Sequence, residues 1–193
     1  MPGLPTTPRG AATSRRILDA AAEEFAARGI AGARIDRIIA AARTNKAQLY
    51  GYFGSKDGLF DAVVADRADR LVDAIPFDAT DLPGWAVAMY DETLRNPQLV
   101  RLMTWLRLER RPEGRLSDDS PRDALKLKII TEAQAAGRIR QCDPFDLFAL
   151  VFNMALAWSA ASGGHTATPG DPEADHERRR ALLRESVQRV VAP

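Results

Sequence analysis

The sequence predicts an all-α fold of about nine helices, and three observations support this prediction. Apolar residues recur every three or four positions along nearly the whole chain, which is the spacing of one helix face. No segment alternates apolar and polar residues convincingly over the length of a strand. Capping residues and prolines stand where helices would begin, and glycines or prolines stand where several would end. The chain is therefore expected to consist of helices joined by turns.

The first four helices follow from the first 76 residues. The first helix ends at Gly29, and a short second helix follows it. Asn45 is placed to cap a third helix, and Gln48 three residues later can complete a capping box. Ser55 is placed to cap a longer fourth helix, which Pro76 stops. The apolar faces of the first two helices consist of Ile17, Leu18, Ala21, Ala22 and Phe25, and of Ile35, Ile38, Ile39 and Ala42.

The remaining helices have equally local signals. Pro97 begins PQLVRLMTWLRLERR and separates it from GWAVAMYDETLRN. The segment SPRDALKLKIITEAQAAG runs from a capping Ser120 to a terminating Gly137. Asp143 and Pro144 begin FDLFALVFNMALAWSAAS, and a glycine- and proline-rich loop precedes the last helix. That last helix carries its apolar residues at Leu182, Leu183, Val187, Val190 and Val191.

Charge is distributed unevenly along the 193 residues, although the net charge is only +1. Residues 1–56 contain nine Lys or Arg and four Asp or Glu, whereas residues 57–193 contain 18 and 22. This split predicts an anion-binding head and a separate body, with chance variation on a solvated surface as the alternative. Residues 1–12, which contain three prolines, are expected to form a flexible basic arm.

The sequence favours a cytoplasmic protein without a membrane partner. Its single cysteine, Cys142, excludes an intrachain disulfide and favours a reducing compartment. The N-terminus lacks the apolar stretch of a signal peptide. The uncharged segment 147–164 approaches the length of a transmembrane helix, but its polar residues and its acidic flank argue against a membrane span.

The same uncharged segment predicts a surface for self-association. A helix that is apolar around its whole circumference must be buried on all sides. In so small a protein a second subunit can cover the outer side, with the last helix joining the contact as a four-helix interface of two-fold symmetry. The expected homodimer interface consists of Leu150, Met154, Ala157, Leu183, Val187 and Val190.

Residues 44–56, TNKAQLYGYFGSK, have the composition of a nucleic-acid reader. A short helix, a tight turn and a second short helix form a helix-turn-helix, whose second helix enters the major groove. Gln48 can form a bidentate pair with an adenine edge. Lys46 and Lys56 stand at helix N-termini, where lysine opposes the helix dipole and an external anion would remove the conflict. The nearby tyrosines either contact phosphate or pack in the core.

The stretch TNKAQLYGYFGSKDGLF resembles the recognition helix and following turn of the TetR (tetracycline-repressor) family, and RRILDAAAEEFAARG resembles that family's first helix. The resemblance covers residues 13–64. It implies a DNA-binding domain at residues 13–55 and a regulatory and dimerisation domain at residues 56–193. It also implies a transcriptional regulator, most often a repressor, that binds a palindromic double-stranded DNA operator as a homodimer. The DNA-binding residues expected on this basis are Arg34, Arg43, Thr44, Asn45, Lys46, Ala47, Gln48, Tyr50, Tyr52 and Lys56.

Two residues depart from the family pattern. Arg34 stands where the family usually has threonine at the start of the second helix, so a capping hydroxyl is missing. Arg43 stands in the turn where the family usually has glycine, and a left-handed backbone there would be mildly strained. Both arginines can instead face the DNA backbone. Arg9, Arg15 and Arg16 either reach DNA as an arm or are disordered.

Large aromatic and flexible side chains gather in the expected body helices. Ordinary core packing is the plain explanation for each one singly, but as a group they suit a pocket for an apolar or aromatic small molecule. The family resemblance implies such an effector, which would move the helix from Lys56 to Ile75 and release DNA. The expected ligand-binding residues are Trp85, Met89, Met103, Trp105, Arg107, Phe152 and Asn153.

The sequence offers no motif for catalysis, metal binding or a cofactor. The only histidines are His165 and His176, in or beside the glycine- and proline-rich loop. We therefore expect no enzyme and no cofactor. Two alternatives to a DNA-binding regulator remain at this level: a helical ligand carrier or enzyme, and an adaptor that presents its aromatic head to an acidic protein.

Overall fold

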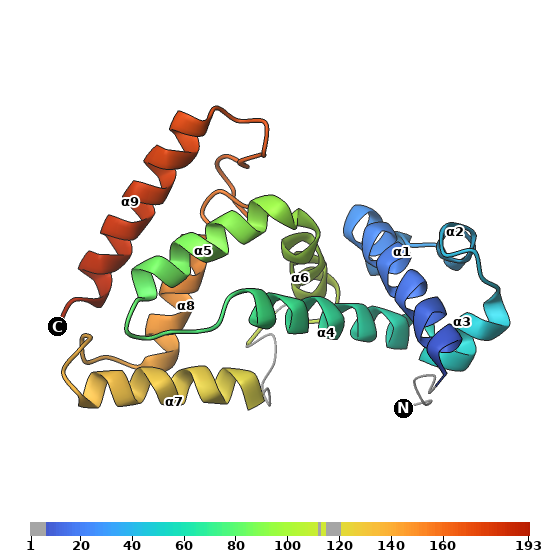
Figure 1. Ribbon diagram of the computed structural model, residues 1–193, viewed down its shortest axis with the longest axis horizontal. Coiled ribbons are helices and arrows are strands. Elements are labelled where there is room, and N and C mark those ends of the chain that lie inside the picture. The colour runs from blue at the N-terminus through green and yellow to red at the C-terminus, as the bar shows by residue number, and fades with distance from the viewer. Residues whose placement is uncertain (1–6, 112, 115–120) are drawn as a thin grey trace. The chain divides into compact units, whose positions relative to one another are not determined.

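The computed structural model describes residues 7–111, 113–114 and 121–193 (Figure 1). Within these residues the structure contains nine α-helices and no β-strand, which confirms the predicted all-α class. The helices are α1 (Pro8–Gly32), α2 (Ile35–Ala41), α3 (Lys46–Phe53), α4 (Lys56–Ala74), α5 (Leu82–Arg95), α6 (Pro97–Glu109), α7 (Pro121–Ala135), α8 (Pro144–Ala155) and α9 (Glu173–Val191).

The chain divides into two compact units, which are named here the head unit and the body unit. The head unit comprises Met1–Arg70 and Gln98–Leu116, and the body unit comprises Leu71–Pro97 and Ser117–Pro193. These units do not follow the boundary predicted between residues 55 and 56. Most of α4 and nearly all of α6 belong with the helix-turn-helix, because both contribute side chains to its core.

The core of the head unit is built from one apolar face of each of five helices. Phe25 of α1 and Phe60 of α4 pack edge to face, with ring centroids 5.2 Å apart. Leu102 of α6 is fully buried in the same cluster. Leu49 and Phe53, four residues apart on α3, are also buried and attach that short helix to the core. The other fully buried large members are Ile17, Ile38, Leu59 and Val63.

Helix α1 begins earlier than the sequence suggested. Thr7 caps it by accepting a hydrogen bond from the Gly10 N–H at 3.2 Å, and Pro8 occupies the first helical turn. Residues 8–12 are therefore helical and not part of a flexible arm, while residues 1–6 of the expected arm lie outside the described residues. The expected end at Gly29 corresponds to a break, since Gly29 has φ 70° and ψ 179°, and one further turn follows it.

The body unit is centred on α5, which packs along α9 and against α8 (Figure 1). Asp81 and Asp143 cap α5 and α8 through backbone N–H groups of their first turns. The core between these helices and α7 includes the fully buried Tyr90, Ile130, Val151 and Val187. Helix α8 ends at Ala155, so the uncharged segment does not continue as a single helix to residue 164.

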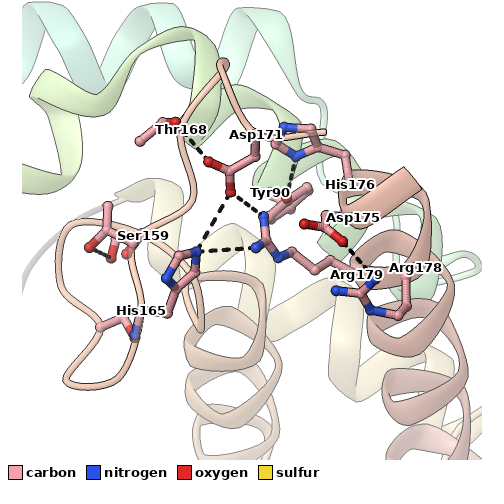
Figure 2. Close-up of polar contacts among 11 residues, drawn as sticks. Tyr90, Ser159, His165, Thr168, Asp171, Asp175, His176, Arg178 and Arg179 are labelled. Carbon is pink, nitrogen blue, oxygen red and sulfur yellow. Dashed lines mark hydrogen bonds and ion pairs between the residues drawn. The ribbon is translucent and has the colours of Figure 1, made fainter. Parts of the chain in front are cut away.

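Polar side chains join the loop before α9 to the helices of the body unit (Figure 2). The buried Tyr90 hydroxyl lies 2.7 Å from His176 Nδ1. Arg179 donates to Asp171 Oδ2 at 2.7 Å, and its Nη2 lies 3.1 Å from His165 Nε2. The Arg179 guanidinium holds the pKa of Asp171 well below its ordinary value. This network attaches the glycine- and proline-rich loop to α9, and Ala167 of the loop is also buried in the body core.

Candidate nucleic-acid interface

Helix α3 is a short, capped helix with one face attached to the head core. Asn45 Oδ1 accepts the Gln48 N–H at 2.9 Å, which confirms the predicted N-cap. The second half of the expected capping box differs, because Gln48 Oε1 accepts the Thr44 hydroxyl at 2.6 Å. Gly54 ends the helix at φ 73°, a conformation that glycine adopts without steric cost. The cap and its buried side chains hold α3 in one orientation.

The structure brings the ten predicted DNA-binding residues together on and around α2, α3 and the start of α4. Their exposure is consistent with a surface role, but none of these contacts with DNA is tested, and each stays a prediction. The exposed members are Arg34, Arg43, Asn45, Lys46, Ala47, Gln48 and Tyr50, and the half-buried members are Thr44, Tyr52 and Lys56.

Lys46 already has an anionic partner within the chain. Its Nζ lies 2.9 Å from Asp36 Oδ1 on α2, and both side chains are mostly exposed. The hydrogen bond to Asp36 raises the pKa of Lys46, and the same contact lowers the pKa of Asp36. An external anion is therefore not required to explain a lysine at this helix N-terminus, contrary to the sequence argument.

Lys56 and Tyr52 also make contacts inside the head unit. Lys56 Nζ donates to the Ala31 carbonyl oxygen at 3.2 Å. Tyr52 packs its ring edge to face with Phe53, with centroids 6.2 Å apart. Tyr50, by contrast, is 40% exposed. Among the aromatic residues of α3, Tyr50 is thus the one most open to an external partner.

The turn between α2 and α3 has the strain expected from its sequence. Arg43 adopts φ 50°, which confirms the left-handed position that an arginine occupies at some steric cost. The Ala42 carbonyl accepts from Arg16 Nε at 3.1 Å, and Arg15 donates to Asp66 at 2.6 Å. Arg15 and Arg16 therefore belong to α1 and pair within the head unit, so neither is part of a disordered arm.

Sequence reasoning missed the role of Glu24 at the start of α2. Arg34 precedes α2 without a side-chain cap, as expected. Its backbone N–H instead donates to Glu24 Oε1 at 3.1 Å, and the same oxygen accepts from Arg37 Nη1 at 3.2 Å. These contacts lower the pKa of Glu24, although burial acts in the opposite direction. A carboxylate ten residues away has no local sequence signal, so only the fold reveals it.

The predicted ligand-binding residues do not form one group. Trp85, Met89 and Phe152 belong to the core of the body unit or pack against it, whereas Asn153 is exposed and donates to the Ala149 carbonyl. Met103, Trp105 and Arg107 lie on α6 in the head unit, because Leu102 anchors that helix in the head core. The prediction of one pocket in the body unit lined by all seven residues is corrected here, because three of these residues belong to the head unit.

The apolar residues of α9 that were predicted to form the dimer interface are mostly buried within the chain, and a neighbouring leucine is exposed instead. Leu183 and Val187 are 2% and 0% exposed, because they pack against α5 inside the chain's own core. They are therefore not an outer surface, and the large apolar side chain that α9 exposes is Leu182. Leu150 on α8 and Ala157, two residues beyond the end of α8, are exposed. Met154 and Val190 are half-buried and pack against the body core.

The described side chains contain no group of three or more potential metal ligands. In residues 7–111, 113–114 and 121–193, every helix is too short or too polar to cross a membrane. The exposed side chains of α3 offer amide, hydroxyl and cationic groups to an anionic or hydrogen-bonding partner.

Comparison with known proteins agrees with this geometry. Residues 17–63 match the family of bacterial regulatory proteins called tetR, and residues 81–189 match the tetracyclin repressor-like C-terminal domain. The HTH-type transcriptional repressor SCO4008 of Streptomyces coelicolor is 34% identical over 184 residues, which cover 93% of this chain and 95% of that protein.

Solved structures give the same result. The putative transcriptional regulator SCO4942 of Streptomyces coelicolor is 37% identical with a TM-score of 0.77, covering 93% of this chain and 98% of that one. AibR, solved in complex with isovaleryl coenzyme A and operator DNA, is 20% identical with a TM-score of 0.64 and shares the fold, covering 94% of this chain and 99% of that one. The chain belongs to the TetR family and is a DNA-binding transcriptional regulator, not an enzyme.

Proposed function

We propose that the chain is a repressor that binds a palindromic operator as a homodimer, with α3 of each subunit in the major groove. The observation that carries this proposal is the exposed face of α3, where Lys46, Gln48 and Tyr50 stand on a helix whose opposite face is buried. A rigidly held helix of this length can place two or three side chains against base edges and phosphates. Repression is supported by the name of the relative SCO4008.

Within this proposal Gln48 reads bases and the cations around it contact phosphates. The glutamine amide can pair with an adenine edge, and its exposed position on the first turn of α3 suits that role. Lys46 and Lys56 would exchange their internal partners, Asp36 and the Ala31 carbonyl, for phosphate oxygens. Such a regulator acts where the DNA is, in the cytoplasm.

The homodimer would form through α8 and α9. Leu150 and Leu182 are 51% and 53% exposed, and large apolar side chains left open on adjacent helices suit a second copy of the chain. A two-fold interface of this kind would place two α3 helices against half-sites about one DNA turn apart. The palindromic operator follows from that symmetry.

The effector would be a small apolar or aromatic molecule bound by the body unit. Trp85 lies at the centre of an aromatic group, with ring centroids 5.2 Å from Phe77 and 6.0 Å from Phe148. Phe152 stacks on Phe148 at 5.8 Å. Flat aromatic side chains of this kind suit an apolar or aromatic ligand. The solved complex of AibR with isovaleryl coenzyme A and operator DNA is a precedent for a small molecule bound by a protein of this fold.

The proposal is tested by footprinting the full-length chain on the DNA that flanks its own gene. A protected, roughly two-fold symmetric site with strongly salt-dependent affinity is expected. Candidate apolar and aromatic molecules are then screened for release of the protected fragment. Failure to bind any duplex at low ionic strength would leave a helical ligand carrier as the better description.

A further inference from the structure

Helix α1 is interrupted at Gly29, one turn before its end. Gly29 has φ 70° and ψ 179°, a combination that is essentially restricted to glycine. In an unbroken helix the Ile30 N–H would donate to the Ala26 carbonyl, and the Ala31 N–H would donate to the carbonyl of residue 27. The backbone at Gly29 turns these donors away from that ladder. The break therefore frees these two donors and the carbonyls of residues 26 and 27, and the carbonyl of the buried Ala26 needs a partner within the protein.

Side chains of α6 satisfy the acceptor. The Ala26 carbonyl oxygen accepts from Arg101 Nε at 2.8 Å and from Trp105 Nε1 at 3.3 Å. Ala26 is buried, so an unsatisfied carbonyl there would carry a desolvation penalty. Two donors from a neighbouring helix thus replace one backbone hydrogen bond of α1.

Glu109 satisfies both donors. Its Oε1 accepts the Ile30 N–H at 3.1 Å, and its Oε2 accepts the Ala31 N–H at 2.9 Å. A carboxylate that bridges two backbone N–H groups at the start of a helical turn acts as a strong cap. Arg101, Trp105 and Glu109 are each four residues apart, so they form one stripe along a single face of α6.

The shape of the contact also requires glycine at residue 29. A Cβ atom on Gly29 would lie 2.3 Å from Glu109 Oε1 and 2.9 Å from Trp105 Cε3. A Cβ at this position would therefore force Glu109 and Trp105 to move. The polar stripe of α6 therefore lies directly over the break, and the two features fit one another.

Arg110, the residue that follows α6, extends the contact to the start of α4. Arg110 donates to Asp57 at 2.5 Å and to Asp61 at 2.6 Å, one turn apart on α4. Lys56, beside Asp57, donates to the Ala31 carbonyl. The end of α1 and the start of α4, which flank α2 and α3 in sequence, are thus fixed at the same place.

We propose that Arg101, Trp105 and Glu109 form a clamp that sets the direction in which the chain leaves α1 and so positions α3 for DNA. Glu109 is the central positioning residue, since it holds both N–H groups that follow the break. Base reading requires α3 to be placed within a fraction of an ångström. This inference rests on the proposed function, because its consequence is specific operator binding.

The test compares Glu109→Ala and Glu109→Gln with Glu113→Gln, a nearby exposed glutamate that gives the same change of charge. Amide hydrogen exchange is measured first, without DNA. Exchange at Ile30 and Ala31 should become about 10- to 100-fold faster in Glu109→Ala and less so in Glu109→Gln, which keeps one acceptor. The Glu113 control should match the unchanged chain.

Affinity for the footprinted operator and for a random duplex is then measured at one salt concentration. Operator affinity should fall about tenfold or more in Glu109→Ala, partly recover in Glu109→Gln, and leave random-duplex affinity unchanged. Unchanged exchange at Ile30 and Ala31 would overturn the clamp. Faster exchange with unchanged operator affinity, or an equal loss on both DNAs, would overturn the positioning role. Absence of operator binding by the unchanged chain would reject the proposed function, and amide exchange would still decide the clamp.

Discussion

The head unit and the body unit use their polar side chains in opposite ways. On α3 of the head unit, Lys46 and Gln48 are exposed on a helix that buries Leu49 and Phe53. In the body unit, Tyr90, His176 and Arg179 turn inward and are all buried. A surface helix can be interpreted from its period alone, whereas an inward polar network depends on partners far away in sequence. The functional surface of the head was therefore accessible to sequence reasoning, and the organisation of the body was not.

The largest expected effect tests whether the exposed leucines of the body unit form the dimer interface that the head unit needs for tight operator binding. The double substitution Leu150→Asp and Leu182→Asp should abolish the homodimer. Operator affinity should then fall about 10²- to 10⁴-fold, since two linked half-site contacts become two independent ones. Analytical ultracentrifugation and operator titration measure both effects.

Leu125→Asp is the matched control, because Leu125 is 56% exposed on α7 and lies outside the proposed interface. It should leave both the dimer and the affinity unchanged. A dimer that survives the double substitution would show that α8 and α9 are not its interface.

Two neighbouring leucines on α9 allow a buried core residue to be compared with an exposed surface residue of the body unit. Leu183→Ala should lower the free energy of unfolding by about 2–5 kcal/mol at every protein concentration, since Leu183 is buried inside the chain. Leu182→Ala should change only the part of the unfolding free energy that depends on protein concentration, which is the part that dimerisation contributes. Urea unfolding at two protein concentrations distinguishes them. If both variants lost the same amount of unfolding free energy and both losses depended on protein concentration, Leu183 would belong to the dimer interface, as the sequence predicts.

A smaller effect concerns the outward face of the head unit. Gln48→Ala should cost about 1–3 kcal/mol of binding at particular base pairs and relax the preference there. Binding to a library of single-base operator variants measures this. Gln188→Ala, at an exposed glutamine of α9, should leave the preference unchanged. An unaltered preference in Gln48→Ala would remove that residue from base reading.

The smallest effect concerns the inward network of the body unit. The Arg179 guanidinium lowers the pKa of Asp171 below its ordinary value of 3.8, so this carboxylate stabilises the fold above that pH and loses its effect as pH falls. Asp171→Asn should therefore lower Tm at pH 7, and its difference from the unchanged chain should narrow below pH 3.8. Thermal unfolding followed between pH 7 and pH 2.5 measures the difference.

Thr168 and His165 also contact Asp171 and remain in place in this experiment. The control is Asp73→Asn, an exposed aspartate of α4. A difference that stays constant over the whole pH range would show that the ion pair with Arg179 does not stabilise the body unit.

The sequence by itself determined the features that depend on near neighbours. The Asn45 and Ser55 caps join residues three apart, and the strained position of Arg43 is a property of one backbone site. The all-α class and the DNA-binding motif follow from the same kind of local pattern. Each of these features was predicted because its physical cause lies within one or two helical turns.

Only the tertiary structure decided which helix faces meet. An apolar stripe on α9 could face either a partner or the chain's own core, and packing against α5 buries Leu183 while leaving Leu182 open. Helix α6 carries Met103 and Trp105, which suit a ligand pocket, yet Leu102 and Glu109 attach it to the rest of the head unit. Glycine at residue 29 signals the end of a helix, but it does not reveal which side chains form hydrogen bonds with the backbone groups freed there. Partners about 80 residues away are chosen by the packing of whole helices, which leaves no periodic or compositional signal in the sequence.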